Sequence, residues 1–248
     1  MKAAARNDLW IAAAFCGAFG LYDLLYVTFQ LSGGPLIGPE LRVLFPDFLV
    51  FWAAAHAWLE GKLTLVYDID AFTHYQNALY PDRFPNVVHF RPFFYPPTWL
   101  LMLLPLGAIA VAKAYGVFMA GTIALATALE GRRDWGGWLA VLTSPGAVWT
   151  VLAGQNTFLS VALFYGGFGL LERSPAAAGI LLGLLSYKPQ IWVLVPLALL
   201  AGRQWRALAW MAGTVALLSL VSLRVFGPDF WLAFIDAARE RSEEHTSE

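Results

Sequence analysis

The feature that most constrains this chain is its succession of long apolar blocks, separated by short polar connections. Of its 248 residues, 59% are hydrophobic and only 13% are charged, whereas soluble domains carry roughly 25% charged residues. A segment in hydrocarbon must pair its backbone N–H and C=O groups internally, which a helix does. The sequence therefore predicts an all-α, polytopic membrane protein.

The N-terminal block predicts a first membrane span over 9–31. Lys2 and Arg6 precede it, which places the N-terminus in the cytoplasm by the positive-inside rule. The block is too long for the core of a signal peptide and has no clear small-residue cleavage site, so we expect it to remain uncleaved. The single cysteine, Cys16, leaves no disulfide framework to predict.

Positive charges in the later connections predict the orientation of the remaining helices. Arg132, Arg133, Arg173, Arg203 and Arg206 lie in short connections that are expected to be cytoplasmic. The long region 32–91 and the connections 154–156 and 186–190 would then face outward. The expected later spans are 112–129, 138–152, 157–171, 176–187, 191–201 and 207–226. Several are shorter than the ~20 residues that a bilayer requires.

This alternation holds only if 95–109 does not cross the membrane. Pro96, Pro97 and Pro105 interrupt helical hydrogen bonding. We therefore expect a helix that lies in, or dips into, the outer leaflet. The orientation gathers most of the unexplained polar residues on the outward face, as a site at the lipid–water boundary requires. These residues are Asp47, Tyr67, Asp68, His89, Arg91, Tyr95, Gln155, Asn156, Lys188 and Gln190.

Asp47 is the candidate catalytic residue. It opens an apolar, aromatic segment, 48–59, and a carboxylate beside lipid is costly unless it is paired, hydrated or functional. The simplest interpretation is an N-cap of the helix Phe48–Leu59, because Asp is favoured there and Pro46 precedes it. The alternative is a general base. The two roles are compatible.

Each of the other candidates also has a simpler interpretation. Lys188 either extends to the interface as an anchor or binds a lipid phosphate. Gln155 and Asn156 either terminate adjacent helices or bind sugar hydroxyls. The simplest interpretation of Asp68 is a solvated acid in a loop. We expect His56 to be a buried, hydrogen-bonded histidine. The histidines show no HExxH-type spacing that would indicate a zinc site.

These residue types suit sugar transfer from a polyprenyl phosphate. The leaving group of such a donor is already a phosphate at the membrane surface. Transfer then needs a base for the acceptor hydroxyl and cations or polar donors, such as Lys188, Arg91 and His89, for the phosphate. No Walker motif or GxGxxG fingerprint is present, which argues against direct use of a nucleotide sugar. No cofactor and no nucleic-acid partner are predicted.

An ordered set of motifs resembles glycosyltransferase family 87. The motifs are Pro46-Asp47-Phe48, Tyr67-Asp68, Phe94-Tyr95-Pro96-Pro97, Gly154-Gln155-Asn156 and Lys188-Pro189-Gln190. The resemblance implies a GT-C fold with juxtamembrane helices in the first outer loop. It also implies a multi-pass protein of the bacterial plasma membrane with an extracytoplasmic active site, in which Asp47 matches the catalytic base.

The expected function is inverting transfer of a hexose or pentose from a polyprenyl-phosphate sugar to an envelope glycan or glycolipid. The alternative is a lipid-linked glycan transporter or a non-catalytic membrane scaffold. We expect one domain, 1–240, that is incomplete at its C-terminus, because GT-C enzymes usually continue for several more spans. The composition changes abruptly at 241–248, which predicts a non-native tail.

Overall fold

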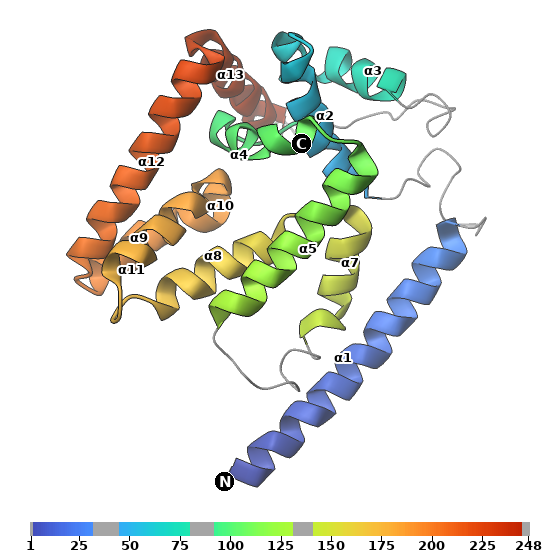
Figure 1. Ribbon diagram of the computed structural model, residues 1–248, viewed down its shortest axis with the longest axis vertical. Coiled ribbons are helices and arrows are strands. Elements are labelled where there is room, and N and C mark those ends of the chain that lie inside the picture. Colours follow the sequence, from blue (N-terminus) through green and yellow to red (C-terminus); the bar gives the residue numbers. More distant parts are fainter. Residues whose placement is uncertain (1, 32–44, 80–91, 131–140, 245–248) are drawn as a thin grey trace.

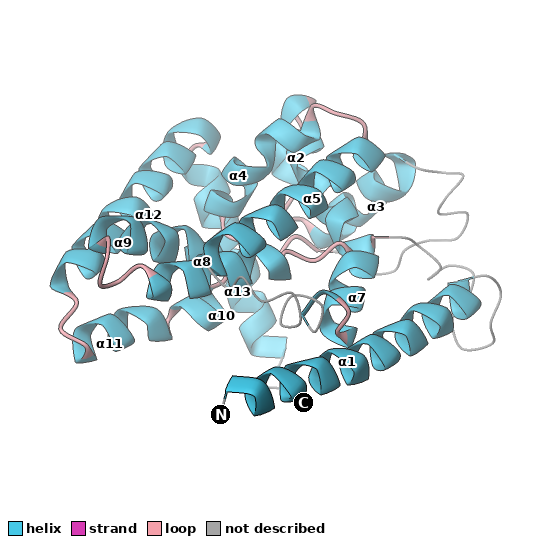
Figure 2. Ribbon diagram, turned by 60° about the horizontal axis from the view of Figure 1, so that its bottom comes forward, coloured by secondary structure: helices cyan, strands magenta, loops and turns pink. Residues whose placement is uncertain are grey.

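The computed structural model describes residues 2–31, 45–79, 92–130 and 141–244. Every regular element in these ranges is a helix (Figure 2), which confirms the predicted all-α class. The elements are α1 (Lys2–Leu31), α2 (Pro46–Leu59), η2 (Leu63–Leu65), α3 (Ile69–Leu79), α4 (Pro97–Gly107), α5 (Val111–Glu130), α7 (Pro145–Ala153), α8 (Thr157–Gly169), α9 (Pro175–Leu184), η3 (Leu185–Tyr187), α10 (Pro189–Trp192), α11 (Leu194–Ala201), α12 (Trp205–Phe226) and α13 (Pro228–Glu244).

Two of the described helices are long and apolar enough to cross a membrane, by length and composition. They are α5, over Val111–Leu129, and α12. Helices α7, α8 and α9 follow other predicted spans but are shorter. The span predicted over 191–201 is divided between α10 and α11. Pro196 explains the break, because it has no N–H to donate to the carbonyl of Trp192 and its ring crowds that group.

Apolar side chains cover much of the outer surface. Phe15, Phe19 and Leu25 on α1 expose 59% to 64% of their surface, and Leu217 and Leu220 on α12 expose 62% and 64%. Exposed apolar surface on this scale marks an interaction site or a membrane-facing surface. Together with the hydropathy of the chain, it agrees with the predicted membrane protein.

The helices separate into a bundle and a group at one of its ends. Along the bundle α5 packs on α8, α8 on α9 and α9 on α12, while α1 packs along α7. Helices α2, α3, α4 and α13 gather at one end of the longer helices (Figure 1). These four helices therefore cover the end of the bundle at which α2 begins.

Helix α4 is a separate element, as expected for 95–109, and it is hydrogen-bonded to α2. Trp52 Nε1 donates to the carbonyl of Ile109 over 2.8 Å, and His56 Nδ1 donates to the carbonyl of Gly107 over 3.0 Å. Both bonds hold the end of α4, and α5 starts after a turn, at Val111. His56 is thus hydrogen-bonded as the sequence predicted, but it is only partly buried, with 30% of its side chain exposed. The leaflet in which α4 lies stays a prediction.

The contact between α9 and α12 depends on two glycines four residues apart. A Cβ on Gly179 would lie 2.3 Å from the carbonyl oxygen of Ala207, and one on Gly183 would lie 2.7 Å from Cβ of Thr214. Small residues at this spacing let helix backbones approach closely, which is a common way for membrane helices to pack. The close approach of α9 to α12 therefore requires glycine at both positions.

We predict that Gly179→Ala and Gly183→Ala each destabilise the protein, by about 1–3 kcal/mol, since the added methyl group overpacks the contact. Thermal unfolding in detergent measures the effect. Gly213→Ala on α12 is the matched control, because nothing lies within 4 Å of its added Cβ. Equal melting temperatures for all three variants would contradict this account of the helix contact.

Candidate functional site

Asp47 lies in the first turn of α2 and is not its N-cap, so the capping prediction was wrong. The N-cap is Phe45, and no side-chain capping hydrogen bond is present there. Pro46 explains the difference, because proline is favoured at the first helical position, where its missing N–H needs no partner. The helix therefore begins at Pro46. Asp47 is partly buried, near the positive end of the helix dipole.

The turn after α7 is fastened to the start of α2. The N–H of Phe45 donates to the carbonyl of Leu152 over 2.9 Å. Gly154 adopts φ 75°, and a Cβ there would lie 2.5 Å from Cβ of Phe48. The N–H groups of Gly154 and Gln155 both donate to the carbonyl of Thr150, over 3.0 Å and 2.9 Å. The left-handed glycine therefore ends α7 and directs the next two residues toward α2.

The side chain of Gln155 reaches the candidate base. Gln155 Nε2 donates a hydrogen bond to Asp47 Oδ2, which joins two residues 108 positions apart in the chain. Two residues that the sequence assigned separately to one face are thus in direct contact. The contact places a neutral amide donor on the carboxylate.

Asn156 is fully buried, and its backbone is firmly held. Its carbonyl accepts hydrogen bonds from Ser160 Oγ (3.1 Å) and Tyr187 Oη (3.4 Å), and these two hydroxyls lie 2.9 Å apart. Neither the nitrogen nor the oxygen of its side-chain amide has a hydrogen-bond partner among the described residues. Although Asn156 precedes α8, its side chain makes no capping bond. A buried amide without partners costs about 1–3 kcal/mol, which makes it a candidate ligand-binding group.

Tyr95 lies beside Asp47 and Asn156. Burial raises the pKa of its hydroxyl, and the negative charge of Asp47 raises it further, whereas the Asn156 amide opposes the shift. The hydroxyl lies close to that amide without meeting the geometry of a full hydrogen bond. The carbonyl of Tyr95 accepts a hydrogen bond from Tyr67 Oη over 2.7 Å. The backbone of Tyr95 is therefore held by Tyr67, and its side chain lies near Asp47 and Asn156.

Lys188 follows Tyr187, the residue that holds the Asn156 carbonyl. Lys188 is partly buried, and this burial lowers the pKa of its ammonium from the usual value. Within the described ranges, no carboxylate pairs with Lys188. The cation therefore has spare capacity for an anionic ligand.

For the remaining predicted site residues that the structure describes, it shows no hydrogen bond or ion pair with Asp47 or Asn156. Gln190 is exposed on α10. Asp68 is also exposed, and its Oδ1 accepts the N–H of Ala71 over 2.9 Å, which gives it a structural role at the start of α3. His89 and Arg91 lie outside the described residues, and their roles stay predictions. The described part of the chain contains no group of three His, Cys, Asp or Glu side chains that could hold a metal ion.

Sequence reasoning missed the residues that support the site. Tyr187 and Ser160 hold Asn156, and the Tyr187 ring stacks on Trp99 with centroids 4.4 Å apart. Trp99 in turn packs edge-on against Phe51 of α2. The available signals were a hydroxyl four residues after Asn156 and an aromatic residue directly before Lys188. Neither signal indicates its partner without the fold.

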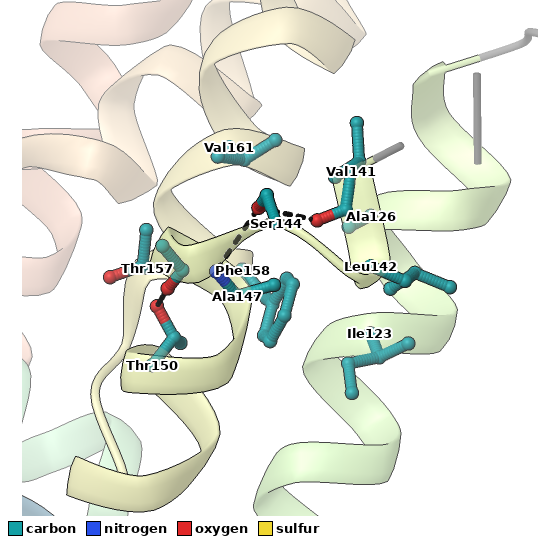
Figure 3. A pocket seen from close by; sticks show the side chains of 11 residues that line it. Ile123, Ala126, Val141, Leu142, Ser144, Ala147, Thr150, Thr157, Phe158 and Val161 are labelled. Carbon is teal, nitrogen blue, oxygen red and sulfur yellow. Dashed lines mark hydrogen bonds between the residues drawn. The ribbon is translucent and has the colours of Figure 1, made fainter. Parts of the chain in front are cut away.

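A separate cavity of about 210 Å³ lies between α5, α7 and α8 (Figure 3). Its lining is mostly apolar and includes Ile123, Ala126, Leu142, Phe158 and Val161. The hydroxyls of Ser144 and Thr150, which also line it, donate to the backbone carbonyls of Val141 and Gly146. With these groups paired inside the protein, the cavity offers little polar chemistry compared with the cluster around Asp47.

Comparison with known families gives one match. The model of the family described as Glycosyltransferase family 87 matches residues 93–247, which is more than half of the chain. The matched part contains Tyr95, Gln155, Asn156, Lys188 and Gln190, whereas Asp47 lies before it. Comparison with curated proteins and with solved structures finds no significant match.

We predict that Gly154→Ala lowers both the stability and the activity of the protein. The substitution strains a left-handed residue and forces the turn away from Phe48, so a loss of about 1–3 kcal/mol in unfolding free energy is expected. Thermal unfolding and a turnover assay measure the two effects. Gly116→Ala is the control, because its added Cβ meets nothing within 4 Å. Wild-type behaviour of Gly154→Ala would show that the turn is not tightly docked on α2.

Proposed function

Because the chain belongs to glycosyltransferase family 87, we propose that Asp47 is the general base of a sugar transfer catalysed at the cluster around Gln155 and Asn156. The family resemblance expected from the motifs is confirmed, and the protein is accordingly a membrane glycosyltransferase. Family membership also favours an enzyme over the transporter or scaffold considered as an alternative. The proposed reaction moves a hexose or pentose from a polyprenyl-phosphate sugar to an envelope glycan or glycolipid.

The carboxylate of Asp47 supplies the base of this reaction. It accepts the proton of the acceptor hydroxyl while that oxygen bonds to the anomeric carbon of the donor sugar. The bond between the anomeric carbon and the phosphate oxygen breaks, and the lipid phosphate leaves with the electron pair. Attack from the face opposite the phosphate inverts the anomeric centre. General base catalysis of this kind contributes about 10²–10⁴-fold to a rate.

The hydrogen bond from Gln155 to Asp47 is the observation that carries the proposal. It ties the one carboxylate in the first turn of α2 to a segment of the family match, although Asp47 itself precedes that match. Tyr95 lies near the same carboxylate, and its hydroxyl lies close to the Asn156 amide, which has no hydrogen-bond partner among the described residues. A carboxylate used only for helix capping would need none of these neighbours.

The other residues take binding roles in this proposal. Lys188 stabilises the departing phosphate, supported by its partial burial and its lack of a carboxylate partner among the described residues. Arg91 and His89 are proposed to assist it. Asn156 and Tyr95 bind sugar hydroxyls, and the exposed Gln190 and Asp68 contact outlying parts of the substrates.

We predict that Asp47→Asn lowers turnover by at least about 10²-fold without unfolding the protein, since the amide cannot accept the acceptor's proton. Transfer of radiolabelled sugar from a synthetic polyprenyl-phosphate donor measures turnover, and thermal unfolding verifies the fold. Asp70→Asn is the matched control, because Asp70 is an exposed acid in the first turn of α3. Near-normal turnover of Asp47→Asn would eliminate Asp47 as the base.

The proposed site faces the extracytoplasmic side of a bacterial plasma membrane. In a Cys16→Ala background, we expect a membrane-impermeant thiol reagent to label Gln190→Cys in intact cells. The same reagent should label Arg173→Cys only after the membrane is opened, since Arg173 lies in a connection predicted to be cytoplasmic. Both positions are exposed. The reverse labelling pattern would place the site on the cytoplasmic side.

A further inference from the structure

We infer that Gln155 is a positioning residue that orients the carboxylate of Asp47, and not a residue that binds sugar hydroxyls. This inference rests on the proposed role of Asp47 as the base. The sequence offered only two roles for Gln155, the termination of a helix and the binding of substrate. The hydrogen bond between Gln155 Nε2 and Asp47 Oδ2 assigns it a third.

The backbones of both partners are fixed relative to each other. The N–H of Gln155 donates to the carbonyl of Thr150 over 2.9 Å, within the turn that Gly154 closes. Two residues before Asp47, the N–H of Phe45 donates to Leu152 of the same α7 end. The added-Cβ contact at Gly154 shows that no space separates the turn from Phe48. The amide therefore approaches the carboxylate from a direction set by two packed helix ends.

This geometry restricts the rotation of the Asp47 carboxyl group. An Asp carboxylate rotates broadly about its last torsion, and a donor on one oxygen selects one orientation. A base must lie within hydrogen-bond reach of the proton that it removes, so its orientation limits the rate. Glutamine suits this task because its amide stays neutral. An Arg or Lys on the same oxygen would favour the ionised carboxylate strongly and weaken it as a base.

The neighbouring amide makes the contrast with substrate binding clear. Gln155 already donates to Asp47, whereas both polar atoms of the Asn156 side chain have no partner among the described residues. Asn156 also has its carbonyl held by Ser160 and Tyr187. The two consecutive amides thus have different roles. Gln155 orients the base, and Asn156 is available to bind the substrate.

Steady-state kinetics of the full chain with Gln155→Ala and Gln155→Met test this division. Met keeps the length of the side chain without its amide, and it decides the question if the Ala variant fails to fold. We expect kcat to fall about 10- to 100-fold, the size of effect that misplacing a catalytic group produces. The KM values for the polyprenyl-phosphate sugar and for the acceptor should stay within about twofold, since uniform binding is not removed. Gln204→Ala, at the start of α12, is the matched control.

A large rise in KM with an unchanged kcat would overturn the inference and restore Gln155 as a binding residue. Binding of polyprenyl phosphate by itself gives a second readout, and Gln155→Met should bind it as the wild type does. In an Asp47→Asn background, Gln155→Met should cause no further loss of turnover, because it acts through Asp47. An additive loss would contradict this.

These experiments also separate the inference from the proposed function. Near-normal turnover of Asp47→Asn would refute the base assignment, whatever Gln155 does. An inactive Asp47→Asn together with a fully active Gln155→Met would refute only the positioning role. Thermal unfolding of each variant verifies that a loss of kcat does not arise from unfolded protein.

Discussion

The docking of the end of α7 on the start of α2 is the contact on which the candidate site depends. It includes the backbone hydrogen bond from the N–H of Phe45 to the carbonyl of Leu152 and the closely packed pair Gly154 and Phe48. Neither residue of the backbone bond carries reactive chemistry. Their contact nevertheless brings Gln155 to Asp47. The polar site is thus a consequence of how two apolar helix ends pack.

Aromatic packing also supports the arrangement of these helices. Tyr187 holds the carbonyl of Asn156 and stacks on Trp99, and Trp99 packs on Phe51 of α2. Contacts between these side chains therefore link α2, through α4 and η3, to the turn before α8. Such packing excludes water, so the few polar groups that remain interact more strongly than they would in solution. The cluster around Asp47 is therefore held in a defined arrangement, as its proposed role requires.

Much of the architecture followed from hydropathy and proline placement. The helical class, the separate α4 and the family were all predictable, because lipid allows few backbone solutions. Helix boundaries were less so. Helix α2 begins at Pro46, two residues before the predicted start at Phe48, so Asp47 lies inside the helix, and Pro196 divided the predicted span over 191–201. In both cases one proline decided the local geometry against a broader pattern.

The sequence by itself determined which residues were candidates, and it predicted sugar transfer from a lipid phosphate. It determined this through charge, hydropathy and motif order, all of which are local properties. The tertiary structure alone decided which candidates touch. It joined Gln155 to Asp47, left the Asn156 amide buried without a partner among the described residues, and gave Asp68 a capping role. The physical reason is that these contacts span up to 108 positions in the chain and depend on helix packing, which no local pattern encodes.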